Sequence, residues 1–389
     1  MWIDGRKNLF KSIESQLKPN EKRILIHAAS LGEFEQGRPV IEEIKRVAPE
    51  YKIVLTFFSP SGFEIRKNYE FADYVFYLPL DTWKNANKFI GLIQPETAIF
   101  VKYEFWNNIL TALKSKKIPT YLISAIFRKN QLFFKWYGGW FRKMLDYFEW
   151  FFVQNNESVE LLKSTGFENV TLSGDTRFDR VFEIAQKVKS IPIVEKFKDG
   201  KFTIIVGSSW KADEEILFEY INRKNSDVKW ILAPHEIHKQ NIERIVKNLE
   251  KPFVCFSQAN ETEANAKEIL VIDNIGMLSS IYQYGNIAYI GGGFGSGIHN
   301  ILEAATFGMP VIFGPNYVKF QEAIDLIDKG GAFTVNNEKT LNSILDQLVN
   351  NKEFCTDKGA ICRKYVDDNR GATLKIIKSV FKERQNHLV

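Results

Sequence analysis

The sequence predicts an α/β protein made of two doubly wound parallel sheets. Its 389 residues exceed what one hydrophobic core usually supports. Short apolar runs alternate with helical patterns along the chain, which is typical of parallel strands joined by helices. The alternation stops after residue 180 and restarts at residue 201, so we expect two domains, each of somewhat under 200 residues.

The first domain is expected over residues 1–180. It contains seven short apolar runs, each followed by turn residues or a helical pattern, as buried parallel strands are. The first of them, RILIHA, opens into the loop of AASLGEFEQGRPV and then a helix. The strand candidates lie at 23–28, 51–58, 74–78, 97–101, 120–124, 150–153 and 170–172.

The second domain is expected over residues 201–370, after a weakly patterned linker at 181–200. Its strand candidates lie at 202–207, 228–233, 252–256, 269–272, 287–290, 311–313 and 332–335. A last helical pattern has no strand after it, so we expect residues 371–389 to pack back on the N-terminal domain. Two Rossmann-like domains that face each other across a cleft make up the GT-B architecture.

The stretch 285–315 carries the strongest local signal for a ligand. An apolar run leads into five glycines between 291 and 297, and a helical pattern begins near Asn300. Glycines let a ligand approach the backbone, and the first turn of a helix favours an anion such as a phosphate. Glu303 could accept hydrogen bonds from ribose hydroxyls. The spacing matches neither the dinucleotide motif nor the P-loop, so glycines that serve only a tight turn are the alternative.

Glu33 is the candidate for acid–base chemistry. It ends the sequence Ser-Leu-Gly-Glu directly after the first strand, where a carboxylate would lie at the carboxyl edge of the sheet. Such a carboxylate could take a proton from an attacking hydroxyl, and Gly32 would leave room for the substrate. The alternative is that Glu33 and Glu35 only stabilise a helix N-terminus, which contributes about 0.3–1 kcal/mol.

Composition and charge limit the classes of partner. Lys and Arg number 52 against 47 Asp and Glu, and this net charge of +5 is too small to predict nucleic-acid binding. It suits an acidic substrate or an anionic membrane surface. Three cysteines without a CxxC pair indicate a reducing compartment, and we expect a cytoplasmic chain. The N-terminus is too charged for a signal peptide, and no apolar run reaches 18 residues.

Residues 127–143, with the sequence FRKNQLFFKWYGGWFRK, are predicted to meet a membrane surface. Their aromatic rings would enter the headgroup region, and the interleaved cations would meet lipid phosphates. These cations are Arg128, Lys129, Lys135, Arg142 and Lys143. The alternative is a core helix whose lysines reach the solvent.

The histidines predict no metal site. His235 and His238 lie three residues apart after a proline, whereas the zinc motif HExxH places its histidines four apart on one helical face. We therefore expect no metal. His299 is interpreted as a turn residue or as one that supports a neighbouring site residue, and not as a catalytic base. His27, inside a strand, is interpreted as a buried histidine whose hydrogen bonds are satisfied.

Six segments together resemble the Kdo (3-deoxy-D-manno-octulosonic acid) transferases, which attach Kdo to the lipid A precursor. They follow the family's order over nearly the whole chain. The segments are IHAASLGEFEQGRPVIEEI, TFFSPSGFE, FVKYEFWNN, SGDTRFDR, DNIGML and GGGFGSGIHNILEAATFGMPVIFGP. The resemblance implies an inverting GT-B glycosyltransferase that uses CMP-Kdo as donor and needs no metal or other cofactor.

The resemblance also implies catalytic roles for three residues. Glu33 matches the family's SxGE glutamate, the general base that deprotonates a sugar hydroxyl of the acceptor. Glu104, in YEFWNN, matches a glutamate that supports the transition state. Arg177, in GDTRFD, stands where many members have lysine, and either cation could offset charge on the donor's carboxylate or departing phosphate.

For the donor nucleotide, the resemblance implies a site in the second domain, held partly by backbone groups. His235 stands where many relatives have arginine, and a neutral imidazole is a weaker partner for a phosphate. The matching positions are Pro234, His235, Asn274, Ile275, Gly276, Asn300, Ile301, Leu302 and Glu303.

The expected function is therefore transfer of Kdo to the lipid A precursor at the cytoplasmic face of the inner membrane, where residues 127–143 would bind the anionic surface. Nucleic acid is not an expected partner. One alternative is another GT-B enzyme, a transferase or an epimerase that uses a UDP-sugar. A second alternative is a non-catalytic protein that binds lipid A precursor or a nucleotide sugar.

Overall fold

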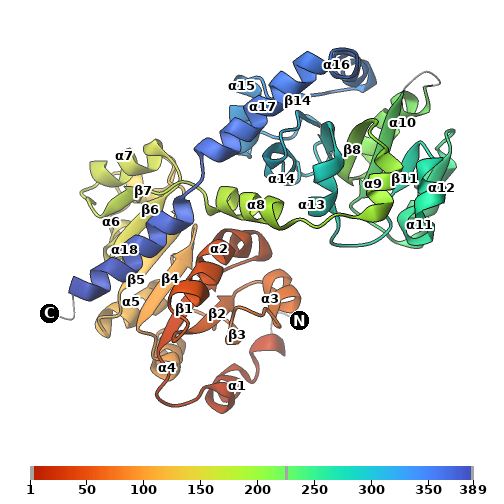
Figure 1. The fold of residues 1–389 in the computed structure, drawn as a ribbon. Coiled ribbons are helices and arrows are strands. Elements are labelled where there is room, and N and C mark those ends of the chain that lie inside the picture. The colour runs from red at the N-terminus through yellow and green to blue at the C-terminus, as the bar shows by residue number, and fades with distance from the viewer. Residues whose placement is uncertain (1–3, 224–226, 387–389) are drawn as a thin grey trace. The chain divides into compact units, whose positions relative to one another are not determined.

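The computed structural model describes residues 4–223 and 227–386, which fold into two compact units. Unit 1 contains the described residues up to Arg180 and those from Asn369 onward, and unit 2 is Val181–Asp368. Each unit is built on a seven-stranded parallel sheet flanked by helices (Figure 1). The predicted fold class, α/β with two doubly wound parallel sheets, is confirmed.

All seven predicted strands of unit 1 are present, with ends that differ by at most one residue. The strands are β1 (Arg23–Ala28), β2 (Lys52–Phe57), β3 (Tyr74–Tyr77), β4 (Thr97–Val101), β5 (Thr120–Ala125), β6 (Trp150–Val153) and β7 (Val170–Leu172). Their order in the sheet is β3-β2-β1-β4-β5-β6-β7. Strands are therefore added in opposite directions from β1 and β4, which makes this pair the topological switch point.

Helices cover both faces of this sheet because successive strand residues point to opposite sides. Leu25 and Val54 pack in one cluster with α4 and α5, whereas Ile24 and Ile53 pack in another with α2 and α18. The helical segments, with 3-10 turns labelled η, are η1 (Asp4–Arg6), α1 (Leu9–Gln16), α2 (Leu31–Val47), α3 (Pro60–Arg66), α4 (Trp83–Ile93), α5 (Asn107–Ser115), η2 (Leu132–Phe134), α6 (Gly139–Arg142), η3 (Leu145–Tyr147), α7 (Asn156–Ser164), α8 (Thr176–Lys187) and α18 (Ala372–Asn386).

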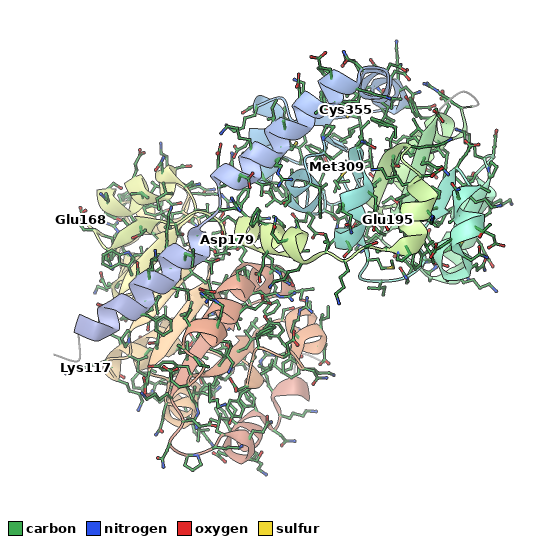
Figure 2. All side chains as sticks on the ribbon, in the orientation of Figure 1. Lys117, Glu168, Asp179, Glu195, Met309 and Cys355 are labelled. Atoms are coloured by element: carbon green, nitrogen blue, oxygen red, sulfur yellow. The ribbon has the colours of Figure 1, made fainter. Side chains whose placement is uncertain are left out.

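The C-terminal helix α18 belongs to unit 1, where Ile376 and Val380 are buried against the sheet. Asp179 of α8 fixes its start (Figure 2). The Asp179 carboxylate accepts hydrogen bonds from the backbone N–H groups of Gly371 (2.6 Å) and Thr373 (2.7 Å). These N–H groups at a helix N-terminus have no partner inside the helix, so the carboxylate stabilises the return of the chain.

All seven predicted strands of unit 2 are also present, with ends that differ by at most two residues. The strands are β8 (Phe202–Ser209), β9 (Val228–Pro234), β10 (Phe253–Cys255), β11 (Ile269–Val271), β12 (Ile287–Ile290), β13 (Val311–Phe313) and β14 (Ala332–Thr334). Their order is β10-β11-β9-β8-β12-β13-β14. β11 thus lies between β9 and β10, and the switch point lies between β8 and β12.

The prediction of a linker at 181–200 is wrong, because this segment is largely helical and belongs to unit 2. Val194 and Phe197 are fully buried and hold α9 in place, although the flanking sequence is polar. The remaining helical segments of unit 2 are α9 (Pro192–Lys198), α10 (Lys211–Asn222), α11 (Lys239–Lys247), η4 (Phe256–Gln258), α12 (Glu261–Asn265), α13 (Leu278–Ile281), η5 (Tyr282–Tyr284), α14 (Leu302–Thr306), α15 (Gln321–Asp328), α16 (Glu338–Asn350) and α17 (Lys352–Asp368).

Candidate active site

In unit 1 the two candidate carboxylates lie at the switch point of the sheet. Glu33 is in the first turn of α2, directly after β1, and Glu104 follows β4, which pairs with β1. The carboxyl ends of parallel strands share one edge, so these two loops are neighbours. Lys102, directly after β4, has a left-handed φ of 72°, a strained conformation of the kind that gathers at functional sites.

Glu33 caps α2 and keeps one oxygen available. Its Oε2 accepts hydrogen bonds from the backbone N–H (2.9 Å) and the hydroxyl (3.0 Å) of Ser30. Its Oε1 has no hydrogen-bond partner among the described residues. The neighbouring Gly32 is exposed, and an added Cβ there would be 4.0 Å from the nearest atom. A substrate hydroxyl could therefore approach a carboxylate that is already oriented.

The environment of Glu33 makes this residue a better base than an ordinary surface carboxylate. Burial raises the pKa of the Glu33 carboxyl, and the nearby charge of Glu104 raises it further. The hydrogen bonds from Ser30 and the positive charge of Lys102 lower the pKa of Glu33 and offset part of this effect. A raised pKa makes the ionised carboxylate a stronger proton acceptor.

Glu104 is held by two ring nitrogens. It is buried, with 8% of its surface exposed, and its Oε2 accepts a hydrogen bond from Trp106 Nε1 at 2.5 Å. His27 Nε2 lies 3.2 Å from the same oxygen, and His27 Nδ1 lies 2.9 Å from Thr56 Oγ1. The expectation that His27 is buried and hydrogen-bonded is confirmed. Its contact with Glu104 was not predicted, because the two residues are 77 positions apart.

Cations gather beside these carboxylates around the ring of Tyr103. Lys102 Nζ lies 5.5 Å from the Tyr103 ring centre, and the Arg128 guanidinium lies 5.9 Å from it. Burial raises the pKa of Tyr103, whereas Arg128 lowers it and the charge of Glu33 raises it. The sequence analysis placed Arg128 on a membrane surface, and the structure brings it also to the carboxyl edge of the sheet.

Arg177 lies in the first turn of α8 and pairs with Asp175. Its backbone N–H and its Nε each donate to an Asp175 oxygen at 2.9 Å, and the carboxylate is nearly buried. Gln36 Nε2 lies 3.4 Å from the same carboxylate. The Arg177 charge is therefore partly neutralised by its own loop, and Asp175 fixes the direction of the guanidinium.

The segment 127–143 is a compact loop with short helical turns and not one helix. Its rings divide into two groups. Phe127 and Phe133 are buried in the core of unit 1, whereas Trp136 is 91% exposed and Tyr137 and Trp140 are also exposed. Arg142 donates hydrogen bonds to backbone carbonyls of its own loop, which holds this shape. We call the exposed residues Leu132, Trp136, Tyr137 and Trp140 the aromatic patch.

In unit 2 the predicted donor residues lie at or after the ends of β9, β11 and β12, and Trp210, which was not predicted, follows β8. These four strands are consecutive in the sheet. The order β11-β9-β8-β12 places at one edge the loop of Asn274, the loop of His235, Trp210 and the glycine loop that ends in His299. The pairing of β11 with β9 brings the loops of Asn274 and His235 together, since Val271 pairs with Leu232 in register. The sequence alone did not predict this strand order.

Trp210, His235 and His299 form a ring stack at this edge. The His235 ring centre is 4.4 Å from that of Trp210 and 4.6 Å from that of His299. Trp210 Nε1 donates to His299 Nε2 at 3.0 Å, so this nitrogen carries no proton. Burial, and then the neighbouring His235, lower the pKa of His299. His299 therefore contacts two neighbouring rings, and sequence analysis missed Trp210 entirely.

The loop after β11 presents an unusual apolar residue to the solvent. Ile275 is 85% exposed, and Gly276 adopts a left-handed φ of 89°, which favours glycine. Asn274 donates through Nδ2 to Met277 Sδ at 2.9 Å, whereas its buried Oδ1 has no partner in the described part of the chain. An exposed apolar side chain and an unsatisfied carbonyl on one loop are typical of a ligand-binding surface.

Glu303 lies at the second position of α14, and both of its oxygens are oriented. Ser279 Oγ donates to Oε2 at 2.6 Å, and Asn300 Nδ2 donates to Oε1 at 3.1 Å. Ile301 and Leu302 are fully buried, so their side chains pack in the core and cannot face a nucleotide. These residues anchor the segment, and only Asn300 and Glu303 present polar side chains.

The helix after the glycine loop has less capacity to attract an anion at its N-terminus than predicted, because α14 spans only five residues. Asn300 Oδ1 already accepts the Leu302 N–H at 3.1 Å. Close packing requires glycine at two positions of this loop. At Gly291 an added Cβ would lie 2.3 Å from Ser208 O, and at Gly293 it would lie 2.6 Å from the Gly314 backbone. Close packing against neighbouring backbone therefore explains these two positions without a ligand, and the phosphate prediction keeps only the rest of the loop.

The histidine pair of the zinc-like sequence is used for other contacts. His238 Nδ1 accepts the Asn241 N–H at 3.2 Å and so caps α11, while His235 lies in the ring stack. No cluster of metal-ligating side chains occurs in residues 5–223 and 227–381, the part of the chain whose side chains are described. Over the same ranges, no helix has the length and apolar character needed to cross a bilayer.

Comparisons with known proteins agree with this arrangement. The sequence model of the family described as 3-Deoxy-D-manno-octulosonic-acid transferase (kdotransferase) matches residues 5–180. The chain is 31% identical over 348 residues to a 3-deoxy-D-manno-octulosonic acid transferase of Aquifex aeolicus, covering 87% of this chain and 90% of the relative. A transferase of the same name from Haemophilus influenzae is 27% identical over 374 residues, covering 92% and 86%.

Solved structures add evidence on the fold. The UDP-GlcNAc 2-epimerase from Neisseria meningitidis superimposes with a TM-score of 0.64 and covers 92% of this chain and 100% of that chain. Its sequence identity is 17%, so the likeness concerns the fold alone, which is GT-B. The sequence matches provide stronger evidence than the fold, because they are long and have higher identity. They show that the chain belongs to the 3-deoxy-D-manno-octulosonic acid (Kdo) transferase family of glycosyltransferases.

Proposed function

We propose that the protein transfers Kdo from CMP-Kdo to a hydroxyl of the lipid A precursor, with inversion at the anomeric carbon. The hydroxyl oxygen attacks this carbon, its proton passes to Glu33, and the bond to the phosphate of CMP breaks. Glu104 stabilises the developing positive charge on the sugar, and Arg177 stabilises the negative charge on the phosphate of the departing CMP. The observation that carries the proposal is Glu33, a half-buried carboxylate with a raised pKa and one available oxygen at the switch point.

The surroundings of Glu33 favour an anionic acceptor. Lys102 and Arg128 flank Tyr103, and Lys102 acts electrostatically on Glu33 itself. A lipid A precursor carries phosphates that such cations attract, whereas a neutral sugar acceptor would leave them unused. Unit 1 is therefore proposed to bind the acceptor and activate its hydroxyl.

Unit 2 is proposed to bind CMP-Kdo. The ring stack holds the His235 ring between two aromatic neighbours, and a ring nitrogen of His235 is proposed to meet the phosphate in place of the arginine of many relatives. Pro234 ends β9 and directs this residue. Glu303 is proposed to accept hydrogen bonds from ribose hydroxyls, and the Asn274–Gly276 loop to meet the base. We propose that transfer needs no metal, so excess EDTA is expected to leave the rate unchanged.

The aromatic patch is proposed to rest on the cytoplasmic face of the inner membrane. Tryptophan and tyrosine favour the headgroup region, and Lys129 and Lys135 in the same loop would meet anionic lipids. Trp136→Ser with Trp140→Ser is expected to weaken binding to vesicles of anionic phospholipid about tenfold or more. Trp83→Ser, a change at an exposed tryptophan of α4, is the matched control. Equal binding by all three proteins would overturn the membrane assignment.

The test of the function is CMP release from freshly generated CMP-Kdo, with and without tetraacylated lipid A precursor in detergent. We expect release that requires the acceptor, together with a product in which Kdo is linked to it. Competition between CMP and UDP separates the alternatives, because an enzyme that uses a UDP-sugar would bind UDP more tightly. A non-catalytic binding protein would hold CMP and release none from CMP-Kdo. Either result would refute the proposed reaction.

A further inference from the structure

His27 lies at the centre of the polar groups beneath the switch point of unit 1, and no step of the proposed reaction uses it. Its side chain is completely buried. In the sheet it pairs in register with Thr56 of β2 and Phe100 of β4. Its Nδ1 contacts Thr56 Oγ1, and its Nε2 contacts Glu104 Oε2. The second contact joins the core of the sheet to the loop of Glu104.

The donors and acceptors around His27 fix the place of one proton. The Trp106 indole can only donate, so Glu104 Oε2 accepts from it. An ionised carboxylate has no proton of its own, and the 3.2 Å contact therefore requires a hydrogen on His27 Nε2. The Thr56 hydroxyl can donate to the Ile26 carbonyl (3.3 Å) or to His27 Nδ1, and Nε2 carries the hydrogen in both cases.

We propose that His27 is a positioning residue of the transfer reaction: its Nε2–H holds the Glu104 carboxylate and fixes the negative charge beside the Glu33 base. The proposal rests on the proposed function, in which Glu33 accepts the proton. Without the His27 donor, the Glu104 carboxylate keeps only Trp106 in the described chain, and its charge is less compensated. Glu104 already raises the pKa of Glu33, after burial, so a less compensated charge raises it further.

Charged and titratable groups on the neighbouring elements also affect the pKa of Glu33. Phe100, Thr56 and Trp106 contact His27 and carry no charge. The charged or titratable groups are Glu33 of α2, Lys102, Tyr103 and Glu104 after β4, and Arg128 after β5. Substitution of His27 leaves all five in place, so a change in the titration of Glu33 reports on the His27–Glu104 contact.

A matched pair of variants tests the proposal. The amide nitrogen of His27→Gln can reach the position of Nε2 and donate to Glu104, whereas that of His27→Asn reaches only the position of Nδ1 and Thr56. We expect His27→Asn to lower kcat about tenfold or more, as loss of a hydrogen bond to a charged group does, with the acceptor KM unchanged. The acid limb of its pH–rate profile should move to higher pH. His27→Gln should restore both properties to near wild type.

A second measurement decides the proposal without turnover. The Glu33 carboxyl is titrated by NMR in protein with ¹³C-labelled glutamate, and Glu33→Gln identifies its signal. A higher Glu33 pKa in His27→Asn than in His27→Gln supports the proposal, and equal values overturn it. If His27→Asn does not fold, Glu104→Gln replaces it and must lower the Glu33 pKa; an unchanged value overturns the proposal. Absence of CMP release by the wild type would refute the proposed function alone.

Discussion

Units 1 and 2 each place candidate residues at one edge of a parallel sheet, but they fill these edges differently. At the edge of unit 1, Glu33 and Glu104 are oriented by side-chain and backbone donors, and most of these groups are buried or half-buried. At the edge of unit 2, Ile275 and His235 lie in the solvent. The first edge suits the proposed proton transfer, and the second offers surface that the proposed donor would cover.

The order of strands contributes to this difference. In unit 1 the loops of Glu33 and Glu104 flank the switch point between β1 and β4, so two carboxylates meet there. In unit 2, β11 lies between β9 and β10, and its pairing with β9 brings Asn274 towards His235. Loops that lie side by side along one edge suit an extended ligand such as a nucleotide sugar. The comparison therefore predicts that mutations separate cleanly into loss of rate and loss of donor binding.

The largest expected effect is on rate and comes from unit 1. Glu33→Ala is expected to lower kcat for Kdo transfer about a hundredfold or more, as loss of a general base does. Its CMP dissociation constant, measured by calorimetry, should stay within about twofold of wild type because the proposed donor site is in the other unit. Glu35→Ala is the control. Glu35 lies two positions after Glu33 in α2, and its carboxylate forms an ion pair with Arg66. A similar loss of rate in both variants would contradict the special role of Glu33.

The second prediction concerns the glycine loop of unit 2. Gly293→Ala places a Cβ 2.6 Å from the Gly314 backbone, so we expect it to lower the free energy of unfolding by about 1–3 kcal/mol. The added Cβ of Gly295→Ala would have its nearest contact at 3.5 Å, and we expect a change within about 0.5 kcal/mol. Urea unfolding of the two variants measures both values. Equal stability would show that the loop adjusts and that its glycines are not needed for packing.

The sequence predicted the elements well because strands buried on both faces have a local signal. All fourteen strands of the two sheets are found where apolar runs and turn residues placed them. The place of Glu33 and Glu104 after strand ends, at the carboxyl edge of the first sheet, also follows from sequence, whereas their proximity depends on the pairing of β1 with β4. Periodicity fails where a short helix is held by few apolar residues, as α9 is by Val194 and Phe197.

The missed features of the sites depend on contacts between distant residues. Trp210 and His299 are 89 positions apart, and their hydrogen bond requires that β8 and β12 be neighbours. His27 and Glu104 meet for the same reason through β1 and β4. The position of β11 beside β9 is likewise a choice among strand orders that no local pattern indicates. Motifs can therefore identify single residues, while the partners of those residues come from topology.

A smaller effect is expected in unit 2 from the ring stack. His235→Ala removes a ring that contacts both Trp210 and His299, and we expect CMP affinity to weaken about three- to tenfold, since aromatic pairs contribute about 0.5–1.5 kcal/mol. The rate at saturating CMP-Kdo should change little. His238→Ala, which affects only the cap of α11, is the control for binding. A loss of rate without a loss of CMP affinity would contradict the division of roles.

The smallest effect tests the electrostatics of the Glu33 edge. Lys102 lowers the pKa of Glu33, so Lys102→Met should raise this pKa by a few tenths of a unit, roughly the effect of one partly screened charge. A general base works only when ionised, so the acid limb of kcat/KM must move to higher pH in the variant. At saturating acceptor the rate at high pH should fall little, because Glu33 is ionised there in both proteins.

Lys84→Met, a change at an exposed lysine of α4, controls for the loss of one positive charge. Its acid limb should coincide with that of the wild type. A shift of Lys102→Met to lower pH would mean that Lys102 acts on a group other than Glu33, and the assignment of the base would have to change. No shift would show that solvent screens Lys102, and the raised pKa of Glu33 would then depend on burial and on Glu104 alone.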